Sequence, residues 1–348
     1  MQDKDYNTLG DALKAAAERD KLRLHTPGHK GGLCGVDLTE LTDESFPSRH
    51  VASAERRAAE IYGAKHGRFL CGGSSQGVKA AVMFSGGGII ADVNSHRSVF
   101  DGARLAGAKC RTVGEKGSVY PIAPRDIMNA LDGASGEDIR AVVLTTPTYY
   151  GYCADVDGIA ELCKKRGLLF ICDGAHGAHF GFSDKLPKSV APYCDICNLS
   201  AHKTLSALTQ SAMLFDNLDG EKSGVLNDAV DIMGTTSPSY LLYASIDYAV
   251  RRAASEETAA AYAALCDATE DIKREFPFLR NDDFSRLVLD CAALGVSPRE
   301  LNDRLCRLGV FPELADERRV VFILTAEDAP TAVTELAAAL RRTISELQ

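Results

Sequence analysis

The chain has 348 residues, 45% of them hydrophobic and 25% charged, with a formal net charge of −9 at pH 7. This length predicts two domains with a sizeable core. No basic block accompanies the acidic balance, which argues against nucleic acid or an anionic membrane as a partner and permits a cationic substrate. The segment from Met1 to Asp5 lacks the basic start and apolar run of a secretory signal. No apolar stretch approaches the ~18–20 residues of a membrane span. We therefore expect a cytoplasmic protein that does not associate with a membrane.

The eleven cysteines are scattered along the chain, and several lie in apolar runs, as Cys172 and Cys291 do. In a cytosolic chain this is typical of small buried hydrophobic residues rather than of disulfides. Cys194 and Cys197 are the one pair with ligand-like spacing. They lack a second pair and fall in a predicted strand, where residues i and i+3 face opposite sides. We therefore expect no metal site.

In chain order, the first feature is a helical pattern over residues 7–19, which ends before the glycine-rich loop 27–32. A second helical pattern over residues 53–62 leads into a short strand at 69–71, a Gly/Ser turn and a helical run over 78–84. Short apolar runs then alternate with helical segments. The runs predicted as strands are 88–91, 142–145, 168–172, 194–199 and 212–215. This alternation is typical of an α/β fold with a mostly parallel, doubly wound sheet.

The C-terminal third of the chain follows a different pattern. An alanine-rich helical stretch over residues 241–264 is long enough to bridge two domains. Beyond it, residues 286–290 and 320–324 have the pattern of strands, and residues 298–308 and 330–347 that of helices. We expect a smaller α+β domain here. The predicted parts are an N-terminal arm helix and loop over residues 1–30, a large domain over 31–252 and a small domain over 253–348.

The most informative pair of residues is Asp173 and Lys203. Each follows an apolar run predicted as a strand, and in a parallel α/β sheet ligands collect at the carboxyl ends of the strands. A lysine there can form a Schiff base with the aldehyde of pyridoxal 5'-phosphate (PLP), and an aspartate beside the pyridine nitrogen keeps that nitrogen protonated. Taken singly, Lys203 could be a surface lysine and Asp173 the cap of an Asp-Gly turn. Together they predict a PLP site.

Eight short motifs support this interpretation. They are Thr26–Gly32, Gly73–Gly77, Asn94–Ser98, Thr146–Gly151, Asp173–His176, Ser200–Lys203, Thr236–Tyr240 and Pro312–Asp316. In this order they resemble the Orn/Lys/Arg decarboxylases, which are PLP-dependent enzymes of fold type I, the aspartate aminotransferase fold. The resemblance runs from about His25 to the C-terminus. One such match would carry little information, but eight in family order are hard to attribute to chance.

The resemblance implies which residues would surround the cofactor. Lys203 would carry PLP as an aldimine, Asp173 would contact the pyridine nitrogen, and His96 would stack on the ring. The further cofactor-binding positions are Ser74, Ser75, Gln76, Ala175, His176, Ser200 and His202. These residue types also have ordinary structural uses, since the serines could form a helix N-cap and the histidines could be cap, loop or buried residues.

Other positions concern a second subunit and the substrate. By resemblance, Thr236 and Ser237 are contributed to the phosphate site of the other subunit, which predicts a homodimer with shared active sites. The expected substrate-side residues are His29, Thr148, Tyr149 and Arg286. Of these, Arg286 could bind the substrate carboxylate as an arginine fork.

By resemblance, the expected function is α-decarboxylation of a basic amino acid, namely lysine, ornithine or arginine, through the Lys203 aldimine. Two departures from the family pattern keep alternatives open. Gly72 and Val78 stand where the family commonly has asparagine, and the chain ends at Gln348, before the further C-terminal domain of full-length members. The alternatives are another PLP reaction, by an aminotransferase, lyase or aldolase, or a catalytically silent PLP-binding scaffold.

Overall fold

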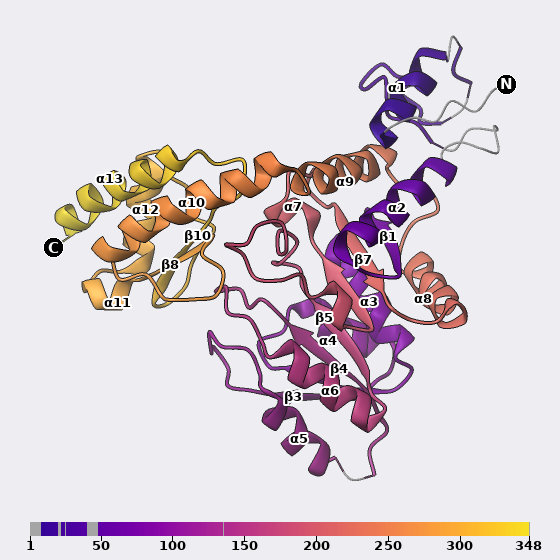
Figure 1. The fold of residues 1–348 in the computed structure, drawn as a ribbon, viewed down its shortest axis with the longest axis horizontal. Coiled ribbons are helices and arrows are strands. Elements are labelled where there is room, and N and C mark those ends of the chain that lie inside the picture. Colours follow the sequence, from indigo (N-terminus) through magenta and orange to yellow (C-terminus); the bar gives the residue numbers. More distant parts are fainter. Residues whose placement is uncertain (1–7, 20–21, 25, 40–47, 135, 348) are drawn as a thin grey trace. The chain divides into compact units, whose positions relative to one another are not determined.

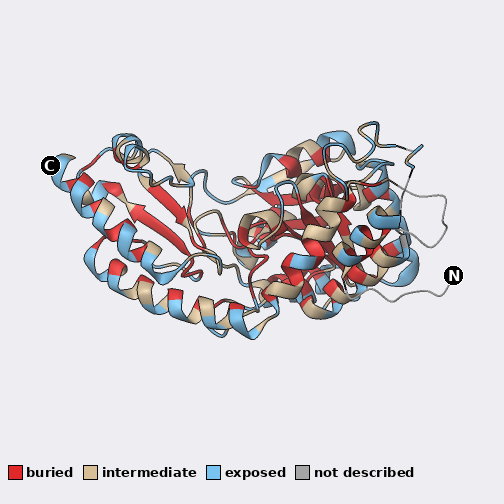
Figure 2. Ribbon diagram, turned by 90° about the horizontal axis from the view of Figure 1, so that it is seen from above, coloured by how far each residue is buried: buried red, intermediate tan, exposed pale blue. Residues whose placement is uncertain are grey.

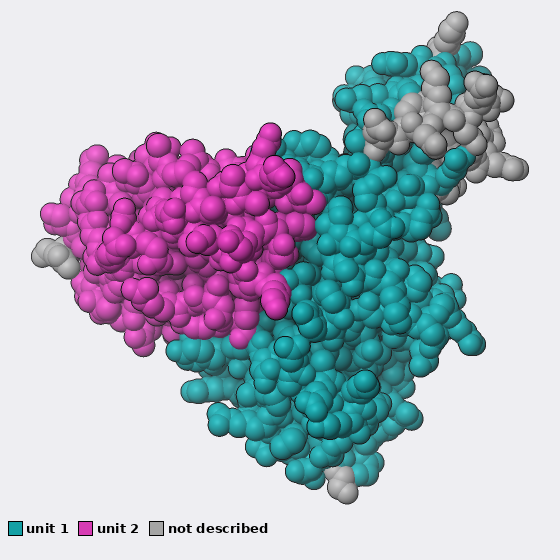
Figure 3. Space-filling view, in the orientation of Figure 1, with its two compact units in different colours: residues 1–146, 154–178, 189–252 teal, residues 147–153, 179–188, 253–348 magenta. Residues whose placement is uncertain are grey.

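The computed structural model describes residues 8–19, 22–24, 26–39, 48–134 and 136–347, and Figure 1 labels their helices and strands. The chain divides into two units (Figure 3). The first contains residues 1–146, 154–178 and 189–252, and the second contains residues 147–153, 179–188 and 253–348. The predicted boundary at residue 252 coincides with the end of the first unit, but two segments expected in the large domain, 147–153 and 179–188, group with the second. The division into an arm and two domains stays a prediction.

A seven-stranded sheet forms the centre of the first unit. Its strands are β1 (His66–Leu70), β2 (Gly88–Asp92), β3 (Cys110–Val113), β4 (Ile139–Thr145), β5 (Leu169–Asp173), β6 (Ile196–Leu199) and β7 (Ala212–Asp216). Their order is β1-β7-β6-β5-β4-β2-β3; β7 runs antiparallel to β1 and β6, and the other neighbouring pairs are parallel. Strands β2, β6 and β7 are buried along their whole length, as expected of strands covered on both faces. The predicted α/β fold class is confirmed.

The first unit also contains helices. In chain order they are α1 (Leu9–Arg19), α2 (Ser48–Tyr62), α3 (Gly73–Phe84), α4 (Arg97–Leu105), α5 (Pro124–Asp132), α6 (Val156–Arg166), the 3-10 turn η1 (Ala191–Tyr193), α7 (Ala201–Thr204), α8 (Gly220–Ile232) and α9 (Tyr240–Ala253). Val78 of α3 and Leu226 of α8 share one buried cluster with Ile171 of β5 and Ile196 of β6. Figure 2 shows the strands in the buried colour and exposed residues along the outer faces of the helices.

The second unit is a smaller α+β structure. Its antiparallel sheet has the order β8 (Arg286–Asp290), β10 (Arg319–Ile323) and β9 (Leu314–Ala315). Its helices are α10 (Glu256–Glu275), α11 (Cys291–Leu294), α12 (Pro298–Arg307) and α13 (Pro330–Leu347). Leu265 of α10 and Leu340 of α13 are fully buried in one cluster with Leu287 of β8 and Val320 of β10. No helix in the described part of the chain has the length and hydrophobicity needed to cross a membrane.

Several predicted elements differ from the structure in their bounds; α3, for example, begins at Gly73, within the expected Gly/Ser turn. Two differences have a side-chain explanation. The single helix expected over residues 241–264 is two helices, because the side chain of Ser255 caps α10 by accepting the N–H of Thr258 at 3.2 Å. The strand expected from Cys194 begins only at Ile196. Before it, the side chain of Asp195 accepts the N–H of Phe170 at 2.7 Å, and the N–H of Asp195 donates to the carbonyl of Phe170 at 3.0 Å.

Candidate active site

The buried carboxylate of Asp173 lies where two parallel strands end. Asp173 is the last residue of β5 and pairs in register with Asn198, near the end of β6. Its side chain is 3% exposed and accepts the N–H of Ala175 at 3.3 Å. Burial raises the pKa of Asp173, while the charge of Lys203, the Ala175 N–H and the charge of His96 oppose that rise. The carboxylate is therefore well placed to hold a positive partner.

A tight turn after β5 places His176 in the same region. The N–H of Gly174 donates to the carbonyl of Asn198 at 2.9 Å, and the N–H of Gly177 donates back to Gly174 at 2.8 Å. A side chain at Gly174 would put its Cβ 2.7 Å from Leu199, so the chain needs glycine to pass this close to β6. His176, inside this turn, is 9% exposed.

Lys203 reaches the turn from the short helix that follows β6. Its Nζ lies 3.1 Å from Nε2 of His176, and its charge acts on Asp173. Three residues singled out by the sequence, Lys203, Asp173 and His176, are therefore brought together at one edge of the sheet.

The N-terminus of α3 is tied to the same edge. Ser74 and Ser75 lie in its first turn, and the hydroxyl of Ser74 contacts that of Ser200, the residue that precedes α7. The side-chain amide of Asn198 donates to the carbonyl of Ser74 at 3.2 Å. Unpaired N–H groups at a helix N-terminus, together with hydroxyls, form a common cradle for a phosphate group.

Three other residues expected to bind the cofactor form hydrogen bonds to the protein backbone. The amide of Gln76 accepts the N–H of Gly72 at 3.0 Å and donates to the carbonyl of Val230 at 3.1 Å, which braces α3 against α8. His202 lies 2.9 Å through its Nδ1 from the carbonyl of Ser211. His96 caps α4, since its ring accepts the N–H of Ser98 at 3.2 Å. These bonds do not test whether Gln76, His202 and His96 bind the cofactor, so those roles stay predictions.

The residues expected from the partner interface and the arm are bonded locally. Thr236 and Ser237 are exposed, and the N–H of Ser237 donates to Thr235 at 3.2 Å. His29 lies 3.1 Å from Asp37 and accepts the N–H of Gly31 at 3.0 Å. These bonds of Ser237 and His29 are to residues of their own segments.

The remaining expected substrate residues belong to the second unit. Tyr149 donates its hydroxyl to Glu313 at 2.8 Å, and the guanidinium of Arg286 lies 6.0 Å from the centre of the Tyr149 ring. Arg286 is 1% exposed, and burial lowers its pKa. Thr148 is also buried and accepts the N–H of Tyr152 at 3.3 Å. The substrate roles of Tyr149, Thr148 and Arg286 therefore stay predictions.

Asn198 is a site residue that the sequence did not single out. It is fully buried, and it links β6 to α3 through Ser74. The only signal for it was an amide inside the apolar run before Leu199, which is unusual for a buried strand.

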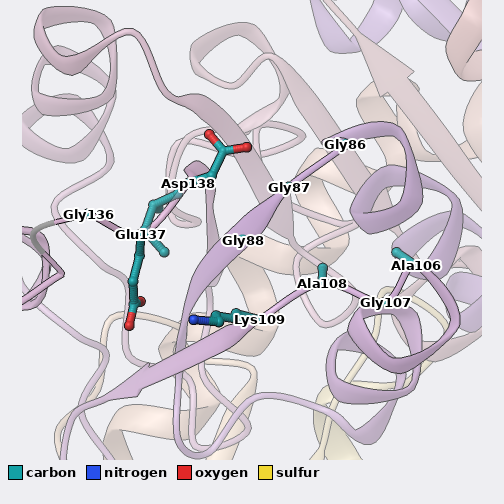
Figure 4. A pocket seen from close by; sticks show the side chains of 11 residues that line it. Gly86, Gly87, Gly88, Ala106, Gly107, Ala108, Lys109, Gly136, Glu137 and Asp138 are labelled. Carbon is teal, nitrogen blue, oxygen red and sulfur yellow. The ribbon is translucent and has the colours of Figure 1, made fainter.

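A separate surface cavity of about 300 Å³ lies at the opposite edge of the sheet (Figure 4). It is lined by Gly88 at the start of β2, by Lys109 just before β3 and by Ile139 at the start of β4. Because these are the amino ends of parallel strands, the cavity is not the candidate active site.

The residues at the carboxyl edge fit PLP. One oxygen of Asp173 accepts from Ala175, and a carboxylate can accept several hydrogen bonds, so a pyridine N–H could also bind there. A lysine amine lies beside it, and a serine-lined helix N-terminus offers a phosphate site. With the sheet order, these features define the class as a PLP-dependent enzyme of fold type I. A serine palmitoyltransferase of Sphingomonas wittichii shares the fold, with a TM-score of 0.71 at 17% identity over 97% of this chain and 84% of that one.

Within that class, the chain belongs to the Orn/Lys/Arg decarboxylase family, because the family's major domain matches residues 34–290. This is a family of PLP-dependent amino acid decarboxylases. An arginine decarboxylase of Bacillus cereus is 27% identical over 97% of this chain and 82% of the relative. The uncharacterized protein YaaO of Bacillus subtilis is 30% identical over 91% of this chain and 73% of the relative. A lysine decarboxylase of Francisella novicida has a TM-score of 0.79 at 18% identity, and the match covers 96% of this chain but 59% of that enzyme.

Proposed function

We propose that this chain removes the α-carboxylate of a basic amino acid, namely lysine, ornithine or arginine, with PLP held by Lys203. The observation that carries the proposal is the grouping of Lys203, Asp173 and His176 where β5 and β6 end. The substrate class is supported by the arginine and lysine decarboxylases to which the chain is similar. When bound, PLP supplies an aldehyde for a lysine and a ring that accepts the electrons left by the departing carboxylate.

In this proposal the protein's own residues bind the cofactor and orient it and the substrate. Asp173 holds the ring nitrogen in its protonated form, because a buried carboxylate favours a positive neighbour. The hydroxyls of Ser74, Ser75 and Ser200 and the first N–H groups of α3 bind the phosphate. Lys203 supplies the amine and can hold or deliver a proton beside the substrate Cα. Further proposed contacts are those of Gln76, His96, Ala175 and His202 with the cofactor, and of His29, Thr148, Tyr149 and Arg286 with the substrate.

The cofactor assignment is tested by its absorption and by its attachment point. Purified protein supplied with PLP should absorb at roughly 420 nm and lose that band on borohydride reduction. Mass spectrometry should then find the reduced adduct on Lys203. A Lys203→Ala protein that still acquired a borohydride-stable adduct would remove Lys203 from this role.

The reaction is tested by its products. Incubation with lysine, ornithine or arginine should release CO2 and the matching amine. Asp173→Asn should lower turnover by about 10²-fold or more while the protein still binds cofactor, since a preorganised charge partner is lost. Keto acid without amine would identify an aminotransferase, and a cofactor that no amino acid perturbs would identify a silent scaffold.

We further propose a cytoplasmic homodimer in which Thr236 and Ser237 complete the phosphate site of the other subunit. The exposure of both residues supports this proposal. A Lys203→Ala protein and a Thr236→Ala, Ser237→Ala protein should each be inactive, and mixing them should restore activity through dimers that contain one intact site. Absence of restoration in dimers shown to have exchanged subunits would refute the shared site.

A further inference from the structure

The amine of Lys203 is surrounded by groups that affect its proton. His176 lies on one side, with its Nε2 3.1 Å from Nζ of the lysine. Burial raises the pKa of the Asp173 carboxyl, and Lys203 lies close enough for its charge to offset part of that rise. Because such an interaction is mutual, Asp173 stabilises the protonated form of Lys203. A protonated amine has no lone pair and cannot bond to an aldehyde carbon.

A nearby base would remove this obstacle, and His176 is the candidate in direct contact. The ring of His202 is bonded through Nδ1 to the carbonyl of Ser211, and the ring of His96 accepts the N–H of Ser98. The turn from Gly174 to Gly177 holds His176 by two backbone hydrogen bonds, so its imidazole is presented to the lysine by a rigid segment.

We propose that His176 is the general base that takes the proton from Nζ of Lys203 before the lysine bonds to the cofactor. The proposal rests on the proposed function, because it assumes that Lys203 is the attachment point. It requires the neutral tautomer of His176 that carries its hydrogen on Nδ1, so that Nε2 is the atom that accepts the proton of Lys203.

The proton balance of this step is complete. The ammonium group of Lys203 gives one proton to Nε2 of His176, and the neutral amine bonds to the aldehyde carbon. The nitrogen then passes one hydrogen to the former aldehyde oxygen, and the imidazolium returns its proton so that this oxygen leaves as water. The products are the protonated carbon–nitrogen double bond, water and neutral His176, and no oxidant or reductant is required.

The test follows the rate of attachment rather than turnover. Protein freed of cofactor is mixed with saturating PLP, so that the binding step does not limit the rate, and the adduct on Lys203 is followed by absorbance and borohydride trapping. His176→Ala and His176→Gln should both slow attachment by about 10²-fold or more, a loss typical of a missing general base. Added imidazole should accelerate the alanine variant in proportion to its concentration. His66→Ala, which removes an exposed histidine on β1, is the matched control and should attach PLP at the normal rate.

The glutamine variant separates proton transfer from positioning. Its amide can keep a hydrogen bond to Lys203 but cannot take up a proton at neutral pH, so a near-normal rate in His176→Gln would overturn the proposal. Failure of imidazole to accelerate a folded His176→Ala protein would overturn it too. If His176→Ala does not fold, the glutamine variant decides alone. If the unmodified protein forms no adduct on Lys203, the proposed function itself fails, which is a distinct result.

Discussion

Replacement of Asp283 by alanine should strongly destabilise the second unit. Asp283 and His179 are both fully buried, with Oδ2 3.2 Å from Nε2 of the histidine. Ser285 adds two bonds to the same carboxylate, from its hydroxyl at 2.6 Å and its N–H at 3.0 Å. Removing the carboxylate leaves the buried N–H of Ser285 without its acceptor and leaves the Ser285 hydroxyl, at 3.1 Å, as the remaining contact of the imidazole Nε2. Loss of one partner of a buried pair costs about 3–5 kcal/mol. This corresponds to a rise of roughly 10²- to 10³-fold or more in the unfolding constant.

The pH dependence of this effect has a definite sign. Burial raises the pKa of Asp283, but the charge and hydrogen bond of His179, the charge of Arg286 and the hydrogen bond of Ser285 outweigh it and leave the pKa below its usual value. The stability from a carboxyl with a lowered pKa is present above its unfolded pKa, near ~3.9, and is lost as the pH falls through the folded value. The difference in the free energy of unfolding between the wild-type protein and Asp283→Ala should therefore be largest near pH 7 and should decrease below about pH 4.

Urea unfolding combined with hydrogen exchange of peptides from β8 would measure the loss within the second unit. Asp271→Ala is the matched control, because this aspartate of α10 forms only an exposed pair with Arg274 and should leave the midpoint unchanged. His179→Phe combined with Asp283→Ala should cost less than the sum of the single variants, since the contact between the two side chains is then counted once and not twice. A loss below about 1 kcal/mol in Asp283→Ala would refute the conclusion that this carboxylate is a stabilising buried hydrogen-bond acceptor.

Three further predictions follow from single contacts. Gly77→Ala would place a Cβ 2.1 Å from the amide oxygen of Asn198, so a loss of about 1–3 kcal/mol and weaker PLP binding are expected in denaturant and cofactor titrations. Combination with Asn198→Ala should relieve part of the strain, and no relief would contradict the steric explanation. Ser255→Ala removes the cap of α10 and should lower stability by about 1 kcal/mol in urea unfolding, whereas an unchanged midpoint would argue against the cap. Tyr149→Phe removes the bond to Glu313 and should lower stability by about 0.5–1.5 kcal/mol, with no loss expected if that bond is absent in solution.

The fold could be predicted mainly where burial imposes an apolar run. Strands β4, β5 and β7 are flanked by turns and consist largely of buried residues, so their positions are close to those expected. Strand β3 escaped prediction, because Cys110–Val113 is short, pairs only with β2 at the sheet edge and contains an arginine and a threonine. The break at Ser255 escaped because alanine-rich helical sequence continues on both sides of it, and only a side-chain cap marks the new helix.

The site was predictable where a motif stands directly at a strand end. Asp173 and Lys203 follow β5 and β6, so the topology of a parallel sheet already brings them near each other. The link from Asn198 to Ser74 joins residues 124 positions apart, and no local pattern encodes such a bond. The same holds for Gln76. Its amide donates to the carbonyl of Val230, and no local sequence pattern predicts this bond.

The two histidines after Asp173 show why spacing alone could not assign their roles. His176 is bonded to Lys203 of the first unit, whereas His179 is bonded to Asp283 of the second. Only Gly177 and Ala178 separate them, so one short segment carries both the proposed base and the buried histidine that contacts Asp283. Both are histidines preceded by Gly-Ala, and their roles are set by partners 27 and 104 positions away. A measurement on one histidine therefore needs the other as its comparison, because loss of His179 should lower stability while loss of His176 should slow attachment of the cofactor.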